Sequence, residues 1–161
     1  MDSSENKSEL LLTVAGSESL LTVAGSESLV TVAGQGLEAM IADYMEKGFL
    51  DNIVDMLKYD AGMYIVVAGL LRDERLRVRI GAIALIEALK EQGLEVIQDI
   101  ADSLLPLLGD DNPSVRGDTA YAFGIIGQKR HVMPLEQLLD DKNMEVAQTA
   151  HESIDSILSK G

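Results

Sequence analysis

Three segments of the chain align with one another without a gap, and their spacing constrains the fold more than any other feature. They are residues 70–89, 107–126 and 138–157, offset by 37 and 31 residues. Each begins with Leu-Leu, passes through a polar turn with Asp in the fourth place, reaches Val, and continues with the apolar periodicity of a helix. A repeat of this length is typical of stacked helical hairpins. The sequence therefore predicts an all-α solenoid.

Helical periodicity extends beyond the three segments and sets the expected domain organisation. Residues 35–62 predict an N-terminal helical cap, with one helix ending at Gly48 and a second beginning at Phe49. Residues 63–161 predict the repeats, and the whole solenoid is expected to contain about three to four helical hairpins. Within them, Met63–Leu71 is apolar on all sides and is expected to be buried all round. The other expected helices span residues 75–91, 94–108, 113–127, 131–139 and 144–159, with Asn112 and Asn143 as N-caps.

Residues 1–34 carry a different repeat, of nine residues, in three copies that read SELLLTVAG, SESLLTVAG and SESLVTVAG. Nine residues make 2.5 helical turns, so successive copies would face opposite sides of a helix. The Gly that ends each copy also weakens a helix or a strand. One interpretation is a flexible tail. The other is that each Leu-rich copy is a docking peptide.

The composition excludes several classes of protein. Acidic residues outnumber basic ones by 27 to 13, which gives a net charge of −14, so the chain repels nucleic acid. The absence of cysteine excludes disulfides and thiolate metal sites. No apolar run reaches the length of a membrane span, and the acidic start does not match a secretory signal. We therefore expect a cytoplasmic protein with no membrane association.

The middle repeat resembles a known family. Residues 115–127 resemble the second helix of a HEAT repeat of the phycobilisome-lyase-like type. The matching residues are Val115, Arg116, Ala120, Ala122, Phe123, Gly124, Ile126 and Gly127. The resemblance implies a right-handed α-α superhelix, related to armadillo-like arrays, with second helices on its concave face. It also implies a structural ladder between repeats, in which Asp73 pairs with Arg79 and Asp110 with Arg116.

This chain lacks the catalytic residues of the enzymes that this family includes. The HEAT-type deoxyhypusine hydroxylases hold iron with several His-Glu pairs, whereas this chain has one such pair, His151-Glu152, and one other histidine, His131. The similarity to bilin lyases lies in generic repeat residues, which support a fold and not an activity. The Asp doublets at 110–111 and 140–141 lack calcium-loop spacing and precede helices, where acidic residues are favourable. We expect no enzyme activity, no metal and no cofactor.

A binding surface is the remaining expectation. Positions two, six and ten after the Val of each repeat should face away from the hairpin partner, and in the first two copies they form an apolar stripe: Ile80, Ala84, Ala88, Gly117, Tyr121 and Ile125. Either other helices cover this stripe or it binds an apolar peptide or helix. A cluster of arginines lies nearby, and Arg75 and Arg77 either pair with local acids or contact an acidic partner.

The predicted function is a non-catalytic adaptor or scaffold that binds a protein or peptide segment on the concave face. The alternatives are an accessory factor of an enzyme system, similar to a chromophore lyase, and a structural protein that forms a homodimer through the stripe.

Overall fold

The computed structural model describes residues 26–161, with side chains from residue 34 onward, and its described residues form helices and no strands. The chain divides into two units, residues 1–39 and 40–161, and the helical hairpins belong to the second. The elements are α2 (Ser26–Glu46), α3 (Leu50–Tyr59), η2 (Ala61–Ile65), α4 (Val66–Arg72), α5 (Leu76–Glu91), α6 (Ile97–Leu104), η3 (Leu105–Gly109), α7 (Pro113–Ile126), η4 (Lys129–His131), α8 (Val132–Glu136) and α9 (Met144–Ser159). The predicted all-α solenoid is confirmed.

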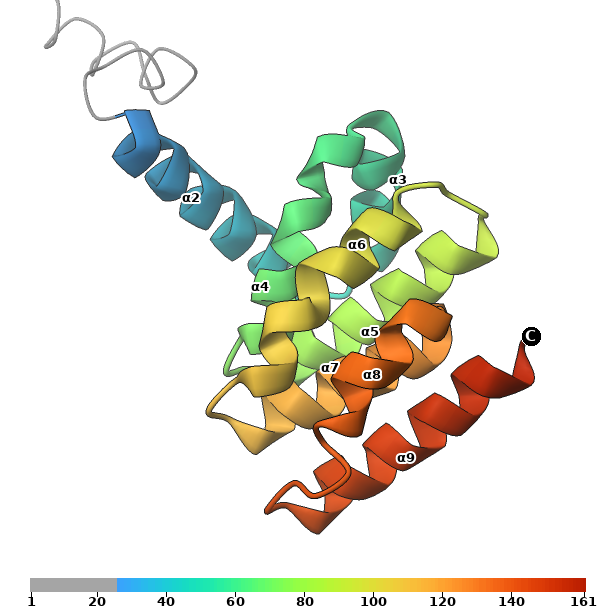
Figure 1. Ribbon diagram of the computed structural model, residues 1–161. Coiled ribbons are helices and arrows are strands. Elements are labelled where there is room, and N and C mark those ends of the chain that lie inside the picture. The colour runs from blue at the N-terminus through green and yellow to red at the C-terminus, as the bar shows by residue number, and fades with distance from the viewer. Residues whose placement is uncertain (1–25) are drawn as a thin grey trace, which may run out of the picture. The chain divides into compact units, whose positions relative to one another are not determined.

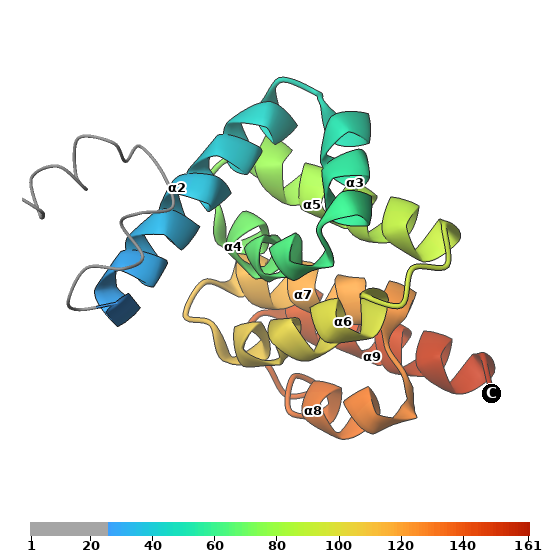
Figure 2. The same cartoon turned by 90° about the horizontal axis from the view of Figure 1, so that it is seen from above.

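Three hairpins follow one another within residues 40–161. The first pairs α4 with α5, the second pairs α6 and η3 with α7, and the third pairs α8 with α9 (Figure 1). The second helices α5, α7 and α9 pack side by side, while α4 contacts α6 and η3 contacts α8. Figure 2 shows the same succession from above, with α3 beside α5 at one end and α9 with α8 at the other. The array therefore has two layers of helices.

Asparagine caps and glycines mark the starts and ends of several helices at the positions that the sequence predicts. The side chain of Asn112 accepts a hydrogen bond from the N–H of Ser114, and Asn143 caps α9 in the same way. Such caps bind N–H groups that have no partner inside the helix. Gly48 and Gly93 follow α2 and α5 with φ angles of +86° and +66°. Glycine adopts this left-handed conformation without steric cost, so both glycines end their helices as expected.

The tightest packing joins α7 to α9. Phe123 is fully buried in α7 and its ring lies 5.0 Å from the ring of His131, centroid to centroid. A Cβ added at Gly124 would lie 2.8 Å from the Ser153 Oγ of α9, and one added at Gly127 would lie 2.7 Å from the Ile157 Cδ1. Because a side chain at either position would force the helices apart, these glycines set the distance between α7 and α9.

Two expectations about the elements require correction. The segment Met63–Leu71 is not buried all round, because its first three residues lie in the 3-10 turn η2 and Ile65 is 57% exposed. The helix expected over 94–108 begins at Ile97 and tightens into η3 from Leu105, since Pro106 has no N–H to donate.

The expected tail, residues 1–34, lies mostly outside the described residues, so its flexibility stays a prediction. Helix α2 begins at Ser26 and crosses the expected boundary at residue 34. The third nonapeptide copy is therefore helical in spite of its glycine. Once the amphipathic segment beyond residue 37 has formed a helix, each added residue contributes one hydrogen bond without a new nucleation step.

The core predicts opposite responses for two neighbouring aromatic residues of α7. Phe123→Ala should lower the free energy of unfolding by about 3–5 kcal/mol, since it leaves a cavity between hairpins. Tyr121→Ala should cost only about 1 kcal/mol, because Tyr121 is 51% exposed. Urea unfolding followed by circular dichroism measures both. A larger loss for Tyr121→Ala would contradict the observed register of α7.

Candidate interaction surface

The turn between the two helices of each repeat is built on one aspartate. The fourth residue of each aligned segment is Asp73, Asp110 or Asp141, and its Oδ1 accepts a hydrogen bond from the backbone N–H two residues later at 2.9 Å in all three repeats. This arrangement holds the chain in a tight turn just before the second helix. The repeated aspartate therefore has one shared structural role.

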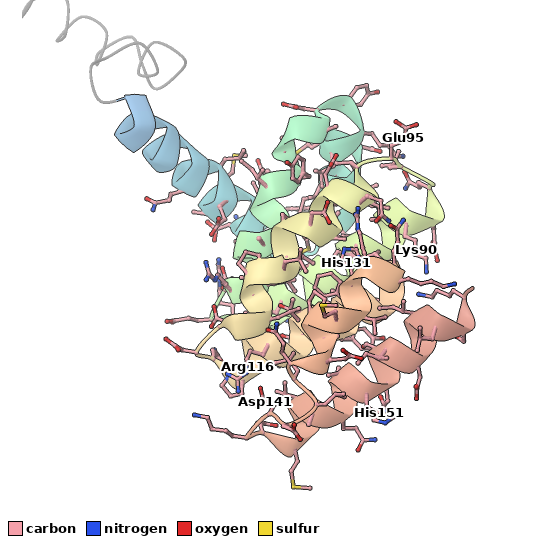
Figure 3. All side chains as sticks on the ribbon, in the orientation of Figure 1. Lys90, Glu95, Arg116, His131, Asp141 and His151 are labelled. Carbon is pink, nitrogen blue, oxygen red and sulfur yellow. The ribbon has the colours of Figure 1, made fainter. Side chains whose placement is uncertain are left out.

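An arginine links each of the first two turns to the following repeat. Arg116 donates from Nη1 to the backbone oxygens of Asp110 and Asp111, at 2.8 and 3.1 Å, and from Nε and Nη2 to both carboxylate oxygens of Asp141, at 2.7 and 2.8 Å. Figure 3 shows Arg116 and Asp141 together. Arg79 repeats the pattern with the carbonyls of residues 73 and 74 and with the carboxylate of Asp118.

This network differs from the ladder expected from the family resemblance. Arg79 and Arg116 do reach their own turns, but they bind carbonyl oxygens rather than the carboxylates of Asp73 and Asp110. The Asp110 carboxylate instead accepts from Arg72 Nε of the preceding repeat at 3.0 Å. The Asp73 carboxylate accepts from Arg75 Nε and Nη2, both at 2.9 Å.

The ion pair between Arg116 and Asp141 favours the charged form of the Asp141 carboxyl. Arg116 is the main cause that holds the pKa of the Asp141 carboxyl below its usual value of 3.8, and the N–H of Asn143 adds to the effect. Burial opposes this shift, since the Asp141 side chain is only 7% exposed. A planar guanidinium that meets a carboxylate through two parallel hydrogen bonds is the strongest form of such a pair.

Arg75 and Arg77, expected at the edge of the binding surface, lie in different surroundings. Arg75 pairs with Asp73, with Asp43 and with Glu46, at distances of 2.7 to 2.9 Å, and these carboxylates raise its pKa. Arg75 therefore stabilises the contact between the last turn of α2 and the first repeat turn, and four of its five N–H groups are already donated to these carboxylates. Arg77 is exposed and makes no ion pair within the described residues.

The apolar stripe is only partly open to solvent. Ile80 is 59% exposed and Tyr121 is 51% exposed. The other four members, Ala84, Ala88, Gly117 and Ile125, are half-buried. A Cβ at Gly117 would lie 3.6 Å from Val146 Cγ2, so this position faces α9. The exposed part of the stripe is therefore concentrated at two residues.

A shallow depression of about 350 Å³ adjoins these residues between the starts of α5, α7 and α9. Tyr121 and Gly117 line it together with Leu76, which is 60% exposed and lies one helical turn before Ile80. Sequence reasoning misses Leu76 because it precedes the Val from which the stripe is counted. We call Leu76, Ile80 and Tyr121 the apolar triad.

A second depression, of about 400 Å³, lies where α5, α7 and α9 end. Ile125 of the stripe lines it, and so do three lysines that sequence reasoning does not single out: Lys90, Lys129 and Lys160. These lysines are 31 to 70 residues apart in sequence, and no local pattern connects them. Only the stacking of the hairpins brings them to one place.

The two histidines have separate surroundings. His151 is exposed in α9, with Nδ1 3.3 Å from an Asp155 oxygen. His131 is buried, and its Nδ1 accepts the N–H of Gln128 at 2.9 Å. Within residues 34–161, no three His, Cys, Asp or Glu side chains group together as metal ligands. The helices of the described segment include none that is long and apolar enough to cross a membrane.

Comparison with known proteins places the repeats in a family. The family model for HEAT repeats matches residues 65–155, which is more than half of the chain. No curated protein matches the sequence. A crystal structure of an engineered protein is 22% identical, with a TM-score of 0.49, over 98% of this chain and 65% of that one. The chain thus spans about two thirds of the length of that engineered protein.

The link between the second and third repeats predicts an acid-sensitive contribution to stability. Asp141→Asn should lower the unfolding midpoint at pH 7 by roughly 5–10 °C, because it leaves a largely buried Arg116 without its carboxylate. Asp55→Asn, in the exposed pair with Lys58, should change the midpoint little.

The pH dependence of this effect follows from the lowered pKa of Asp141. A carboxyl with a lowered folded-state pKa stabilises the fold fully above its unfolded-state pKa, and loses that effect as the pH falls through the folded-state value. The difference in unfolding free energy between the wild-type protein and Asp141→Asn should therefore be constant from pH 7 to about 5 and shrink below about 4. Urea unfolding at several pH values measures it. A constant difference down to pH 3 would contradict the ion pair.

Proposed function

This chain belongs to the HEAT-repeat family, and we propose that it is a non-catalytic adaptor that binds a segment of a partner protein on the surface of α5, α7 and α9. Stacked helical repeats present such surfaces because each repeat adds one helix to a continuous face. Families of this kind generally mediate protein interactions. The proposal therefore assigns binding, rather than chemistry, to the row of second helices.

The apolar triad carries this proposal. Leu76, Ile80 and Tyr121 are each more than half exposed and belong to neighbouring helices. Leu76 and Tyr121 line one depression, and Ile80 lies one turn further along α5. Apolar surface gains about 25 cal/mol for each Å² removed from water, and a tyrosine adds a polar group at low entropic cost. The triad is suited to an apolar side chain of a partner.

The surroundings of the triad favour a helix or an extended segment as the partner. Ala84 and Ala88 continue the stripe along α5 with small side chains, so a partner backbone can approach closely there. Arg77 is exposed near the start of the same helix and is available to an acidic group at the edge. Arg75 is left out of this surface, because three carboxylates already bind it.

The proposal is tested by immobilising the wild-type chain and a double variant and comparing the partner proteins that each retains. The full chain with Ile80→Ser and Tyr121→Ser should lose at least about tenfold in affinity for proteins that the wild-type chain retains, as expected for central contact residues. The matched control is Tyr59→Ser with Ile65→Ser, which removes one tyrosine and one isoleucine of similar or greater exposure from α3 and η2. The control should bind like the wild type.

Two outcomes would contradict this function. Equal loss in both double variants would mean that the α5–α7–α9 surface has no special role. A sedimentation experiment in which the wild type is a dimer and Ile80→Ser with Tyr121→Ser is a monomer would assign the triad to self-association. Circular dichroism of each variant before the capture experiment separates loss of binding from loss of fold.

A further inference from the structure

The second depression on the α5–α7–α9 surface combines an apolar floor with a cationic rim. Its floor contains the isoleucines Ile97, Ile125, Ile126 and Ile157. Its rim carries Lys90 from the end of α5, Lys129 from η4 and Lys160 from the end of α9. Figure 3 shows Lys90 at the end of the helices opposite to Arg116 and Asp141. We call these three lysines the lysine rim.

Within the described residues, the three lysines of the rim form no ion pair with an acidic side chain. None of the side chains that line the depression is acidic, although the chain as a whole carries a net charge of −14. Lys160 Nζ donates to the backbone oxygens of Gly124 and Ile125, at 2.6 and 3.1 Å, and so keeps one of its three protons for another acceptor. Burial and the nearby charge of Lys90 lower the pKa of Lys160.

Helix electrostatics explain only part of this arrangement. Cations are favourable at helix C-termini, which accounts for Lys90 and Lys160 each on its own helix. Lys129 belongs to a different element, the short turn after α7, and it adds a third positive charge to the same space. The mutual repulsion of these lysines costs free energy, and a bound anion would remove that cost.

We propose that this depression binds a carboxylate of the partner segment, from an acidic residue that adjoins a branched aliphatic residue. The inference rests on the proposed adaptor function and specifies the chemistry of the partner. The lysine rim receives the carboxylate, while the isoleucine floor receives the aliphatic side chain.

The position of the depression connects it with the apolar triad. Ile125 of the floor follows Tyr121 of the triad by one helical turn of α7, a rise of about 6 Å. A partner segment that contacts Tyr121 therefore reaches the lysine rim within a few residues. The lysine rim is a local concentration of positive charge on a chain with a net charge of −14, so it attracts a carboxylate to this end of the surface and orients the segment.

Three short peptides test whether the depression requires both a carboxylate and an adjoining aliphatic side chain. The probes are acetyl-Ser-Glu-Leu-Leu-Ser-amide, the same peptide with Gln in place of Glu, and the same peptide with Ser in place of both Leu residues. Their blocked ends remove other charges. Amide chemical shifts of the full chain are followed by NMR during each titration. The first peptide should cause saturable shifts at residues 125–129, and each altered peptide should bind about tenfold more weakly.

Two lysine variants provide the matched comparison. Lys129→Gln and Lys90→Gln should each weaken binding of the first peptide about two- to fivefold, the range of a partly exposed ion pair. Lys142→Gln removes the same charge from the turn before α9, outside the rim, and should leave the affinity unchanged. Lys160 is not substituted in this comparison, because its bonds to α7 also hold the last hairpin.

The inference is overturned if the Glu and Gln peptides bind equally, if Lys142→Gln weakens binding as much as Lys129→Gln, or if no peptide shifts residues 125–129. Shifts confined to Leu76, Ile80 and Tyr121 would also overturn it, while they would leave the adaptor function in place. Failure of the adaptor function has a separate signature, the retention of partners by Ile80→Ser with Tyr121→Ser.

Discussion

The array depends on one repeated hydrogen bond, which a backbone N–H donates to the turn aspartate two residues before it. It occurs at Asp73, Asp110 and Asp141 with the same length, and each time it closes the turn just before the second helix. The bond also leaves the carbonyl oxygens of the turn free to accept from an arginine. Arg116 donates to a carbonyl oxygen of its own turn and also binds Asp141 of the next repeat, so that one side chain joins two hairpins.

The second helices do not pack equally closely against one another, and this difference accompanies the exposure of Ile80 and Tyr121. Glycines at positions 124 and 127 let α9 lie close against α7. In the first repeat, the place of Gly124 is taken by Glu87, whose side chain is exposed. The contact of α5 with α7 is accordingly less extensive than that of α7 with α9. Ile80 and Tyr121 stay exposed on these two helices, and the depression beside Leu76 adjoins Tyr121.

Local patterns in the sequence are sufficient to predict the fold, whereas contacts between distant residues are not predictable from them. Asn112 and Asn143 predict helix starts correctly, because a cap acts on its nearest neighbours. The pairing of Arg75 with Asp43 and Glu46 is not predictable from local patterns, since these partners lie about 30 residues earlier and only packing brings them near. The lysine rim is unpredictable for the same reason. Exposure of the stripe is predictable at Ile80 and Tyr121, whereas burial of the remaining members depends on how closely the helices approach.

The distribution of constraints along each second helix has a consequence for how such a protein diversifies. The turn network occupies the start of α5 and α7 and consists of arginine and aspartate groups that join neighbouring hairpins. The ends of α5, α7 and α9 carry no part of that network. Substitutions of Lys90 or Lys129 near these ends alter the charge of the surface without touching the turn network, whereas Gly124 and Gly127 at the end of α7 are constrained because they set the approach of α9. The recognition properties can therefore change at exposed positions of these helix ends, while the turn network and the glycines of α7 maintain the architecture.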